Sequence, residues 1–408
     1  MSNSKSHVVV VGAGQAGAGV AMALRNNGFH GAITLIGDEP HPPYERPPLS
    51  KDVLQGRTAV EKTWIQPISV FNEKEIEVRL DIRVTAIDAE RRVLTLSDRS
   101  QISYDKLVLA TGARPRMLTL PGTNNDRIHV LRTIDDALRL SEQMRTAKSI
   151  AVVGGGFIGL EVAASARAMS VAVTVLEAAP RLMERSLPES VATFLADVHK
   201  ENGVAIVTNA RLRGFEQSES GVRVLLDADD FLDVDCVVMG VGAIPNTEIA
   251  EICGLVVQDG IVVDEYGRTS HPDIYAAGDV TRHFNPLLDR HIRLESWQNA
   301  QNQAIAVAKA ITGEPEAYAE VAWLWSDQYH LNIQTAGNPG DWNDFVWRGK
   351  PEDGKFTVLA LADRRIIGAI CINNGRDMRY ARQMITNRVI VDREKLADPA
   401  TPLQSLSR

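Results

Sequence analysis

Cysteine is scarce in this chain, which has three among its 408 residues. Cys236, Cys253 and Cys371 stand apart from one another, and no two of them form a CxxC pair. Enzymes that relay electrons through a disulfide need two neighbouring thiols beside their redox cofactor. The sequence therefore argues against a thiol relay, and we expect all three cysteines to be small apolar residues of the core.

Long apolar runs and metal-binding clusters are also missing. No stretch of about 18 apolar residues occurs, so we expect no membrane-spanning helix. The first six residues lead directly into an apolar stretch and leave no room for a signal peptide, which favours a cytoplasmic location. The net charge of −8 argues against a nucleic-acid partner. No cluster of His, Cys, Asp and Glu has the spacing of a metal site, so we expect no bound metal.

Two glycine-rich turns of the same type are the most informative feature that is present. Gly12-Ala-Gly-Gln-Ala-Gly17 follows the apolar residues 8–11, and Gly154-Gly-Gly-Phe-Ile-Gly159 follows residues 150–153. A strand, a glycine turn and a helix rich in small residues are typical of dinucleotide-binding folds, in which backbone N–H groups of the turn face a pyrophosphate. Two such turns in one chain predict that one dinucleotide reduces another, most simply a nicotinamide nucleotide reducing a flavin.

An acidic residue about 20 positions beyond such a turn binds the adenosine ribose. In the second unit the predicted strand 173–176 is followed by Glu177. Its carboxylate would accept hydrogen bonds from ribose hydroxyls and repel a 2′-phosphate, which favours NADH over NADPH. Arg181 and Arg185 lie nearby and could accommodate that phosphate instead.

In the first unit the corresponding acid is displaced by one residue. The predicted strand 32–36 is followed by Gly37, and we assign Asp38 to the ribose of the flavin nucleotide. Gly278-Asp279 follows another apolar strand, and its carboxylate could accept from the ribityl chain. The alternative for Gly278-Asp279 is an ordinary turn without a ligand.

The length predicts two or three domains, since it exceeds what one hydrophobic core supports. An apolar strand followed by glycine and proline occurs at residues 106–115 and again at 237–245, and we interpret both as crossings between domains. The predicted fold class is α/β, with two Rossmann-type dinucleotide-binding domains and a C-terminal α+β domain. The predicted boundaries are an FAD-binding domain of residues 1–110 and 244–320, an NAD-binding domain of residues 111–243, and a C-terminal domain of residues 321–408.

Longer motifs accompany the glycine turns in a fixed order: Arg46-Pro-Pro-Leu-Ser-Lys51, Leu107-Val-Leu-Ala-Thr-Gly112, Leu131-Arg-Thr133, Gly154 to Glu161, Ala277-Gly-Asp279, Glu295-Ser-Trp-Gln-Asn-Ala300 and Trp325-Ser-Asp-Gln328. With these motifs the chain resembles, over essentially its whole length, the FAD-dependent, NADH-linked ferredoxin reductases of bacterial oxygenase systems. The Pro-Pro-Leu-Ser-Lys and Trp-Ser-Asp-Gln motifs are much more specific than the glycine turns. The resemblance implies a fold similar to glutathione reductase, with a C-terminal interface domain.

Candidate site residues follow from this resemblance together with the glycine turns. The resemblance implies that Lys51 lies near flavin N5 and pairs with Glu161, and these two are the catalytic candidates. A cation there would stabilise the negative charge of the reduced ring, and Glu161 could hold the nicotinamide amide. The candidates for FAD binding are Gly12, Gly14, Ala16, Gly17, Asp38, Arg46, Lys51, Val84, Ala110, Thr111, Gly112, Arg132, Gly278, Asp279 and Trp297. The candidates for NAD binding are Gly154, Gly156, Phe157, Ile158, Gly159, Glu161, Glu177 and Gly242.

The activity that the resemblance implies is NADH:ferredoxin oxidoreductase. A hydride would pass from NADH to FAD, and electrons would leave singly for a small [2Fe–2S] ferredoxin that feeds an aromatic-ring dioxygenase or a P450-type oxygenase. The alternatives are a rubredoxin reductase, a flavin NADH oxidase, and a redox-sensing interaction protein resembling apoptosis-inducing factor.

One departure leaves the ferredoxin-docking surface open. The residues around Trp297 are polar but uncharged, although the family is expected to present a basic face to an acidic ferredoxin. Positive residues are plentiful elsewhere, at Arg364, Arg365, Arg376, Arg379, Arg382 and Arg388. These arginines form either a docking face or an ordinary solvated surface.

Overall fold

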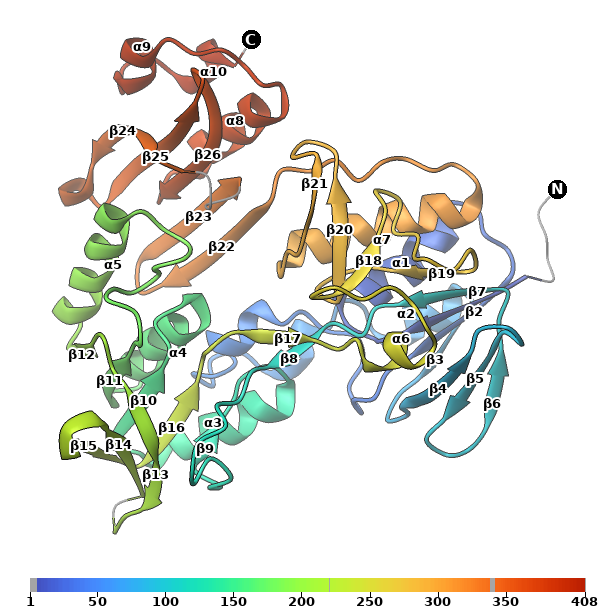
Figure 1. Cartoon of the computed structure of the whole chain (residues 1–408), viewed down its shortest axis with the longest axis horizontal. Helices are drawn as coiled ribbons and strands as arrows, with labels where there is room; N and C mark the ends of the chain where they lie inside the picture. The colour runs from blue at the N-terminus through green and yellow to red at the C-terminus, as the bar shows by residue number, and fades with distance from the viewer. Residues whose placement is uncertain (1–5, 220, 338–341, 408) are drawn as a thin grey trace. The chain divides into compact units, whose positions relative to one another are not determined.

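The computed structural model describes residues 6–219, 221–337 and 342–407 (Figure 1). The chain forms two compact units. The first unit comprises residues 1–45, 61–114 and 244–322, and the second comprises residues 46–60, 115–243 and 323–408. The chain passes between them along β8 (Ala113–Pro115) and β17 (Ala243–Pro245), which pair in a two-stranded sheet. The division into three domains stays a prediction.

The first unit is built on a five-stranded parallel sheet in the order β19-β7-β1-β2-β3. These strands are β1 (His7–Val11), β2 (Ala32–Ile36), β3 (Ile76–Arg79), β7 (Lys106–Leu109) and β19 (Ile274–Ala276). Val8 to Val11 are almost fully buried, as a central parallel strand requires. The small residues of α1 (Gln15–Asn26) let α7 (Trp297–Thr312) pack closely against it.

Two three-stranded sheets, one antiparallel and one mixed, and two short helices belong to the first unit as well. One sheet contains β4 (Val84–Asp88), β5 (Val93–Leu96) and β6 (Gln101–Ser103), and the other contains β18 (Ile261–Val263), β20 (Thr281–Asn285) and β21 (Arg290–Ile292), with β18 and β20 paired in parallel. The helices are α2 (Ile68–Glu73) and α6 (Glu248–Ile252).

The second unit repeats the parallel-sheet plan in the order β12-β11-β10-β16-β9. Its strands are β9 (Ile128–His129), β10 (Ser149–Val153), β11 (Ala172–Leu176), β12 (Val204–Val207) and β16 (Cys236–Met239), and its helices are α3 (Ile134–Thr146), α4 (Phe157–Ala168) and α5 (Glu189–Glu201). A three-stranded antiparallel sheet adds β13 (Leu212–Gln217), β14 (Val222–Leu226) and β15 (Phe231–Val234).

The C-terminal part of the second unit is an antiparallel sheet with helices, in the order β22-β23-β26-β25-β24. Its elements are β22 (Trp323–Gln328), β23 (Leu331–Gly337), β24 (Asp344–Lys350), β25 (Lys355–Ala362), β26 (Arg365–Ile372), α8 (Gly375–Thr386), α9 (Arg393–Ala397) and α10 (Leu403–Leu406). The predicted fold class, two Rossmann-type folds with a C-terminal α+β part, is confirmed.

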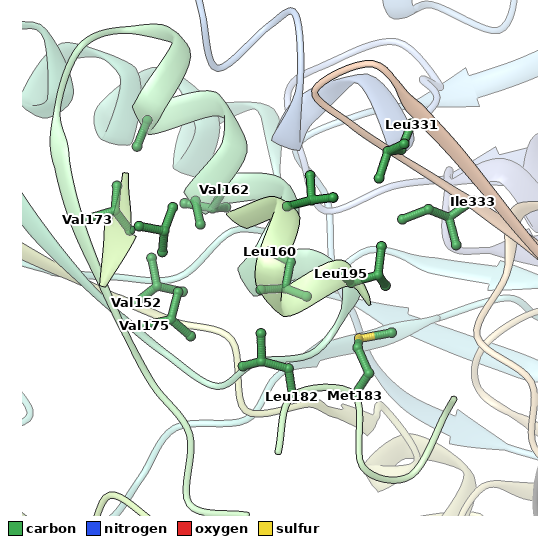
Figure 2. Packing of buried hydrophobic residues seen from close by; sticks show 14 of the residues in the cluster. Val152, Leu160, Val162, Val173, Val175, Leu182, Met183, Leu195, Leu331 and Ile333 are labelled. Carbon is green, nitrogen blue, oxygen red and sulfur yellow. The ribbon is translucent and has the colours of Figure 1, made fainter. Parts of the chain in front are cut away.

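A single hydrophobic cluster joins the parallel sheet of the second unit to its C-terminal sheet. Figure 2 shows Leu160 of α4 and Leu195 of α5 together with Leu331 and Ile333 of β23. Since Leu160 precedes Glu161, this packing fixes the turn of α4 that carries the candidate carboxylate. The parallel sheet and the C-terminal sheet of the second unit therefore both contribute to the core that holds this part of α4 in place.

Candidate functional site

The first glycine turn, in the first unit, depends on close approaches that only glycine permits. Gly12 has a φ of +106°, and a Cβ there would lie 2.1 Å from the carbonyl oxygen of Ala110. A Cβ on Gly17 would lie 1.8 Å from the carbonyl oxygen of Gly12. Both contacts are with backbone that cannot give way, so these glycines bring the ends of β1 and β7 and the start of α1 together.

The second glycine turn repeats this geometry in the second unit. Gly154 has a φ of +103°, and a Cβ there would lie 2.4 Å from the carbonyl oxygen of Gly240, at the end of β16. A Cβ on Gly159 would lie 2.2 Å from the carbonyl oxygen of Gly154. The two predicted turns therefore share both their sequence pattern and the steric reason for it.

The middle glycines of the turns leave space for a ligand. Gly14 and Gly156 are the N-caps of α1 and α4, and neither helix has a side-chain hydrogen bond at its cap. A Cβ on either glycine would meet nothing within 4 Å. Each turn thus presents helical N–H groups and the positive end of a 12-residue helix to open space. This arrangement fits the pyrophosphate of a dinucleotide, one in each unit.

Further candidates for the flavin nucleotide gather at the carboxyl ends of the first unit's strands. A Cβ on Gly278 would lie 2.8 Å from Cβ of Ala16, so the Gly278-Asp279 turn lies against the first glycine turn. Asp38 follows β2 and forms a solvent-exposed ion pair with Arg83, at 3.0 Å. The crevice outside the carboxyl ends of such a sheet, where the strand order reverses, is where ligands of these folds bind.

Other predicted residues of the first unit lie on neighbouring elements. Thr111 follows β7 and donates its hydroxyl to the carbonyl oxygen of Asn246 at 2.8 Å, and the carbonyl oxygen of Gly112 accepts from Asn246 N at 3.0 Å. Val84 is buried at the start of β4, and Trp297 is the first residue of α7. The structure places Ala16 and Gly278 next to each other.

Sequence analysis missed a glutamine that supports this turn. Gln303 of α7 is buried, and its Oε1 accepts from Gly278 N at 2.7 Å and from the hydroxyl of Thr281 at 3.0 Å. No sequence pattern pointed to it, because the contact joins residues of two separate elements. Gln303 therefore holds the conformation of the Gly278-Asp279 turn.

Glu177 lies beside the second glycine turn, as its position after β11 predicted. Its carboxylate accepts from Gly155 N at 2.6 Å and from Ala179 N at 2.7 Å. Arg181 contacts Glu184 at 2.6 Å and donates to the carbonyl oxygen of Leu187 at 2.9 Å, so this arginine is engaged within its own loop. The acidic group at the turn is therefore not neutralised by Arg181.

Lys51 and Glu161 form an ion pair in the second unit. Lys51 follows a 3₁₀ turn, Pro47–Ser50, and its Nζ lies 3.0 Å from Oε1 of Glu161 and donates to the carbonyl oxygen of Pro47 at 3.1 Å. Glu161 lies in the second turn of α4 and is 4 % exposed. A carboxylate so deeply buried needs both a counter-charge and hydrogen-bond donors, and Lys51 provides only part of this.

Two serines that the sequence analysis gave no role supply the missing donors. Ser50 donates its hydroxyl to Oε2 of Glu161, and Ser326 of β22 donates its hydroxyl to Oε1 at 2.6 Å. Both serines are buried. They belong to the two most specific motifs of the sequence, and that specificity was the available signal. The structure shows that the two motifs meet at one carboxylate.

The remaining candidates of the second unit occupy more open positions. Arg46 donates from Nη1 to the carbonyl oxygen of Arg132 at 2.5 Å. Phe157 and Ile158 begin α4, and the side chain of Ile158 is exposed. Gly242 has a φ of +99°, and a Cβ there would meet nothing within 4 Å.

The cysteines are not arranged for redox chemistry. Cys236 and Cys371 are buried, and burial raises the pKa of each thiol to about 12. Cys253 is only partly buried, so the expectation that all three are core residues is too strong, and burial still raises the pKa of its thiol. Within the described ranges no group of three or more His, Cys, Asp or Glu could hold a metal ion. No helix in the described part of the chain is long and apolar enough to cross a membrane.

Comparison with known proteins gives consistent matches. The family model described as pyridine nucleotide-disulphide oxidoreductase matches residues 6–304, and the one described as reductase C-terminal matches residues 323–407. The chain is 42% identical over 398 residues to the anthranilate 1,2-dioxygenase system ferredoxin–NAD(+) reductase component of Burkholderia cepacia, covering 97% of this chain and 98% of that protein.

Solved structures match over the same length. The ferredoxin reductase for the CYP199A2 system from Rhodopseudomonas palustris has a TM-score of 0.96 at 36% identity, covering 99% of this chain and 100% of that one. The covalent putidaredoxin reductase–putidaredoxin complex also has a TM-score of 0.96 at 36% identity, covering 99% of this chain and 98% of that one.

Proposed function

Because the chain belongs to the pyridine nucleotide-disulphide oxidoreductase family, we propose that it passes electrons from NADH to a small [2Fe–2S] ferredoxin that serves an oxygenase. It is an oxidoreductase that uses FAD and NAD(H). A relative named as a reductase component of a dioxygenase system and a solved complex of a reductase with putidaredoxin support this acceptor. A cytoplasmic location stays a prediction.

The observation that carries the proposal is the ion pair of Lys51 with Glu161 on the helix that follows the second glycine turn. When bound, FAD accepts the two electrons of a hydride and gives them up one at a time. Lys51 supplies a positive charge that favours a reduced, negatively charged ring. Glu161 is held by Lys51, Ser50 and Ser326 in one orientation, from which it would orient the nicotinamide amide of NADH.

We assign one nucleotide to each unit on the basis of the glycine turns. Gly12 to Gly17, with Asp38 and Asp279, would hold FAD in the first unit, and Gly154 to Gly159, with Glu177, would hold NADH in the second. Cys236 and Cys371 have strongly raised thiol pKa values, so neither supplies a thiolate at neutral pH. We therefore propose that electrons leave directly, without a thiol relay.

The test is anaerobic reduction of two protein acceptors, ferredoxin and rubredoxin, by the FAD-loaded protein with limiting NADH, together with NADH consumption in air without a protein acceptor. We expect two molecules of [2Fe–2S] ferredoxin reduced for each NADH, measured by the bleaching of the ferredoxin absorbance. Faster reduction of rubredoxin would indicate the rubredoxin reductase alternative. Rapid NADH consumption in air without any protein acceptor would indicate an NADH oxidase. The redox-sensing alternative predicts a reduced complex that persists with every acceptor.

A further inference from the structure

A line of polar side chains continues from Glu161 through Ser326, entirely within the second unit. Nε2 of Gln328 lies 3.0 Å from the hydroxyl of Ser326, and Oε1 of Gln328 lies 2.9 Å from Nε2 of His199 on α5. The hydroxyl of Tyr329 lies 3.2 Å from Nδ1 of His199. Ser326, Gln328 and His199 are each no more than 2 % exposed. These groups therefore depend on one another for hydrogen bonds.

The direction of every hydrogen bond in this line follows from its first member. Glu161 is paired with Lys51, and an ionised carboxylate only accepts. Ser326 has one hydroxyl hydrogen, and the 2.6 Å contact with Glu161 requires it. Ser326 must then accept from Gln328, which places the NH₂ of that amide toward Ser326 and its oxygen toward His199.

The tautomer of His199 is fixed by the same reasoning. The oxygen of Gln328 is an acceptor, so Nε2 of His199 carries the hydrogen. Burial lowers the pKa of His199, so the imidazole is neutral and its Nδ1 accepts from the hydroxyl of Tyr329. All four donors, on Tyr329, His199, Gln328 and Ser326, point toward Glu161. A line of hydrogen bonds that share one direction is mutually strengthening.

We propose that Gln328 and His199 are positioning residues for hydride transfer, acting through Ser326 on the Glu161 carboxylate. They touch neither NADH nor flavin in this proposal. Their effect is to force the hydroxyl of Ser326 to donate to Oε1 of Glu161, which holds that oxygen in place together with Lys51, while Ser50 holds Oε2. The inference rests on the proposed role of Glu161 in orienting the nicotinamide.

The test is stopped-flow reduction of the FAD-loaded protein by NADH, resolving the limiting rate from the apparent NADH Kd. Ser326→Ala removes the donor and should lower the limiting rate roughly 10- to 100-fold, the effect of losing one hydrogen bond to a charged group. Gln328→Glu has the shape of glutamine but, when ionised, only accepts, so in that form it should draw the Ser326 hydroxyl away from Glu161 and lower the rate similarly. Ser326→Thr keeps the hydroxyl and should restore the rate.

A matched control separates positioning from stability. Thr357 of β25 is fully buried and donates to Asp377 at 3.1 Å, outside this line of groups. Thr357→Val should match the stability loss of Ser326→Ala in urea while reducing at the parent rate. A readout independent of turnover is ¹⁵N NMR of labelled histidine, with His199→Gln for assignment. It should find His199 neutral with its hydrogen on Nε2.

The outcomes distinguish the positioning role of Gln328 and His199 from the proposed role of Glu161 on which it rests. If Glu161→Ala is slow but Ser326→Ala and Gln328→Glu reduce at the parent rate, the positioning role is wrong and the role of Glu161 stands. If Glu161→Ala itself reduces at the parent rate, both are wrong. A hydrogen on Nδ1 of His199, or a charged imidazole, would overturn the direction of the hydrogen bonds. A Thr357→Val variant as slow as Ser326→Ala would show a general stability effect instead.

Discussion

At the scale of single residues, the carboxylate of Glu177 has an observed structural role and a proposed role in nucleotide selection. Its oxygens accept hydrogen bonds from the backbone of the glycine turn at Gly155 and of its own loop at Ala179. In the proposed function its charge would disfavour a phosphate on the adenosine ribose. The glycine turn and the acid proposed to select the nucleotide are thus joined by a hydrogen bond. A substitution must therefore be chosen that keeps the shape and removes the charge.

Glu177→Gln should narrow the preference for NADH over NADPH. We expect the free-energy difference that corresponds to the ratio of kcat/KM values for the two nucleotides to fall by about 1–3 kcal/mol. The reason is that the ribose would lose one charged hydrogen-bond partner. Steady-state kinetics with ferricyanide as acceptor measure this. Glu184→Gln is the control, since Glu184 pairs with Arg181 and is not assigned to the nucleotide. A parent enzyme with equal kcat/KM for both nucleotides would remove the assignment.

At the scale of elements, each glycine turn contains one glycine that the fold requires and another that leaves space for the ligand. Gly12 and Gly154 are excluded from substitution by backbone contacts, whereas Gly14 and Gly156 face open space. The sequence pattern alone does not distinguish these roles. The structure does, and the difference can be measured.

Alanine at the open glycines should spare the fold and obstruct the ligands. Gly14→Ala should weaken FAD binding, and Gly156→Ala should leave FAD bound while raising the NADH Kd, because each new methyl group occupies the space assigned to a pyrophosphate. We expect either change to cost at most about 1 kcal/mol of folding stability. Flavin content and NADH titration report the two effects. Exchange of the two phenotypes would reverse the assignment of nucleotides to units.

Arg348 of β24 anchors the C-terminal segment through hydrogen bonds to backbone carbonyl oxygens. Its guanidinium is 5 % exposed and donates to the carbonyl oxygens of Leu396, Asp398 and Thr401. Arg348→Met should lower the free energy of unfolding by about 3 kcal/mol, because three carbonyl oxygens lose their donor and Asp377 loses its ion-pair partner at 3.5 Å. Urea unfolding measures this. Arg393→Met, which removes an exposed pair with Asp344, should cost no more than about 1 kcal/mol. Equal losses would contradict the anchoring role.

The sequence predicted the elements at the site better than their contacts. Local patterns predicted both glycine turns, their strands and Glu177, because each depends on the residue types within a short stretch of the chain. The surroundings of Glu161 do not follow from such patterns, because Ser50 and Ser326 lie 111 and 165 residues from it along the chain. The resemblance implied Lys51 as a partner, but hydroxyl donors become visible only when burial is known.

At the scale of the whole molecule, buried histidines make stability depend on pH. Burial lowers the pKa of His283 from 6.5 to about 4, with the charge of His291 adding to the effect, and burial also lowers the pKa values of His129 and His199. The unfolded chain therefore takes up these protons at higher pH than the folded protein does. The contribution of these neutral, buried histidines to the free energy of unfolding is fully present above about pH 6.5. It is lost as the pH falls toward 4.

The urea midpoint should thus be lower at pH 5 than at pH 7.5. His283→Phe should reduce this difference, since His283 contributes up to about 2 kcal/mol of it at pH 5. Tryptophan fluorescence at the two pH values measures the midpoints. His330→Asn, at an exposed position, should leave the difference unchanged. A His283→Phe variant with the full parental dependence would show that other groups cause it.

The core of the second unit sets the order in which the newly made chain can fold. Leu160 is synthesised long before Leu331 and Ile333, yet all three belong to one cluster. During synthesis, the apolar side of α4 lacks its packing partners on β23, and the carboxylate of Glu161 lacks the Ser326 donor, until β22 and β23 have been made. A chain stalled or cleaved before residue 323 would expose this surface, which makes it a natural target for chaperones and proteases.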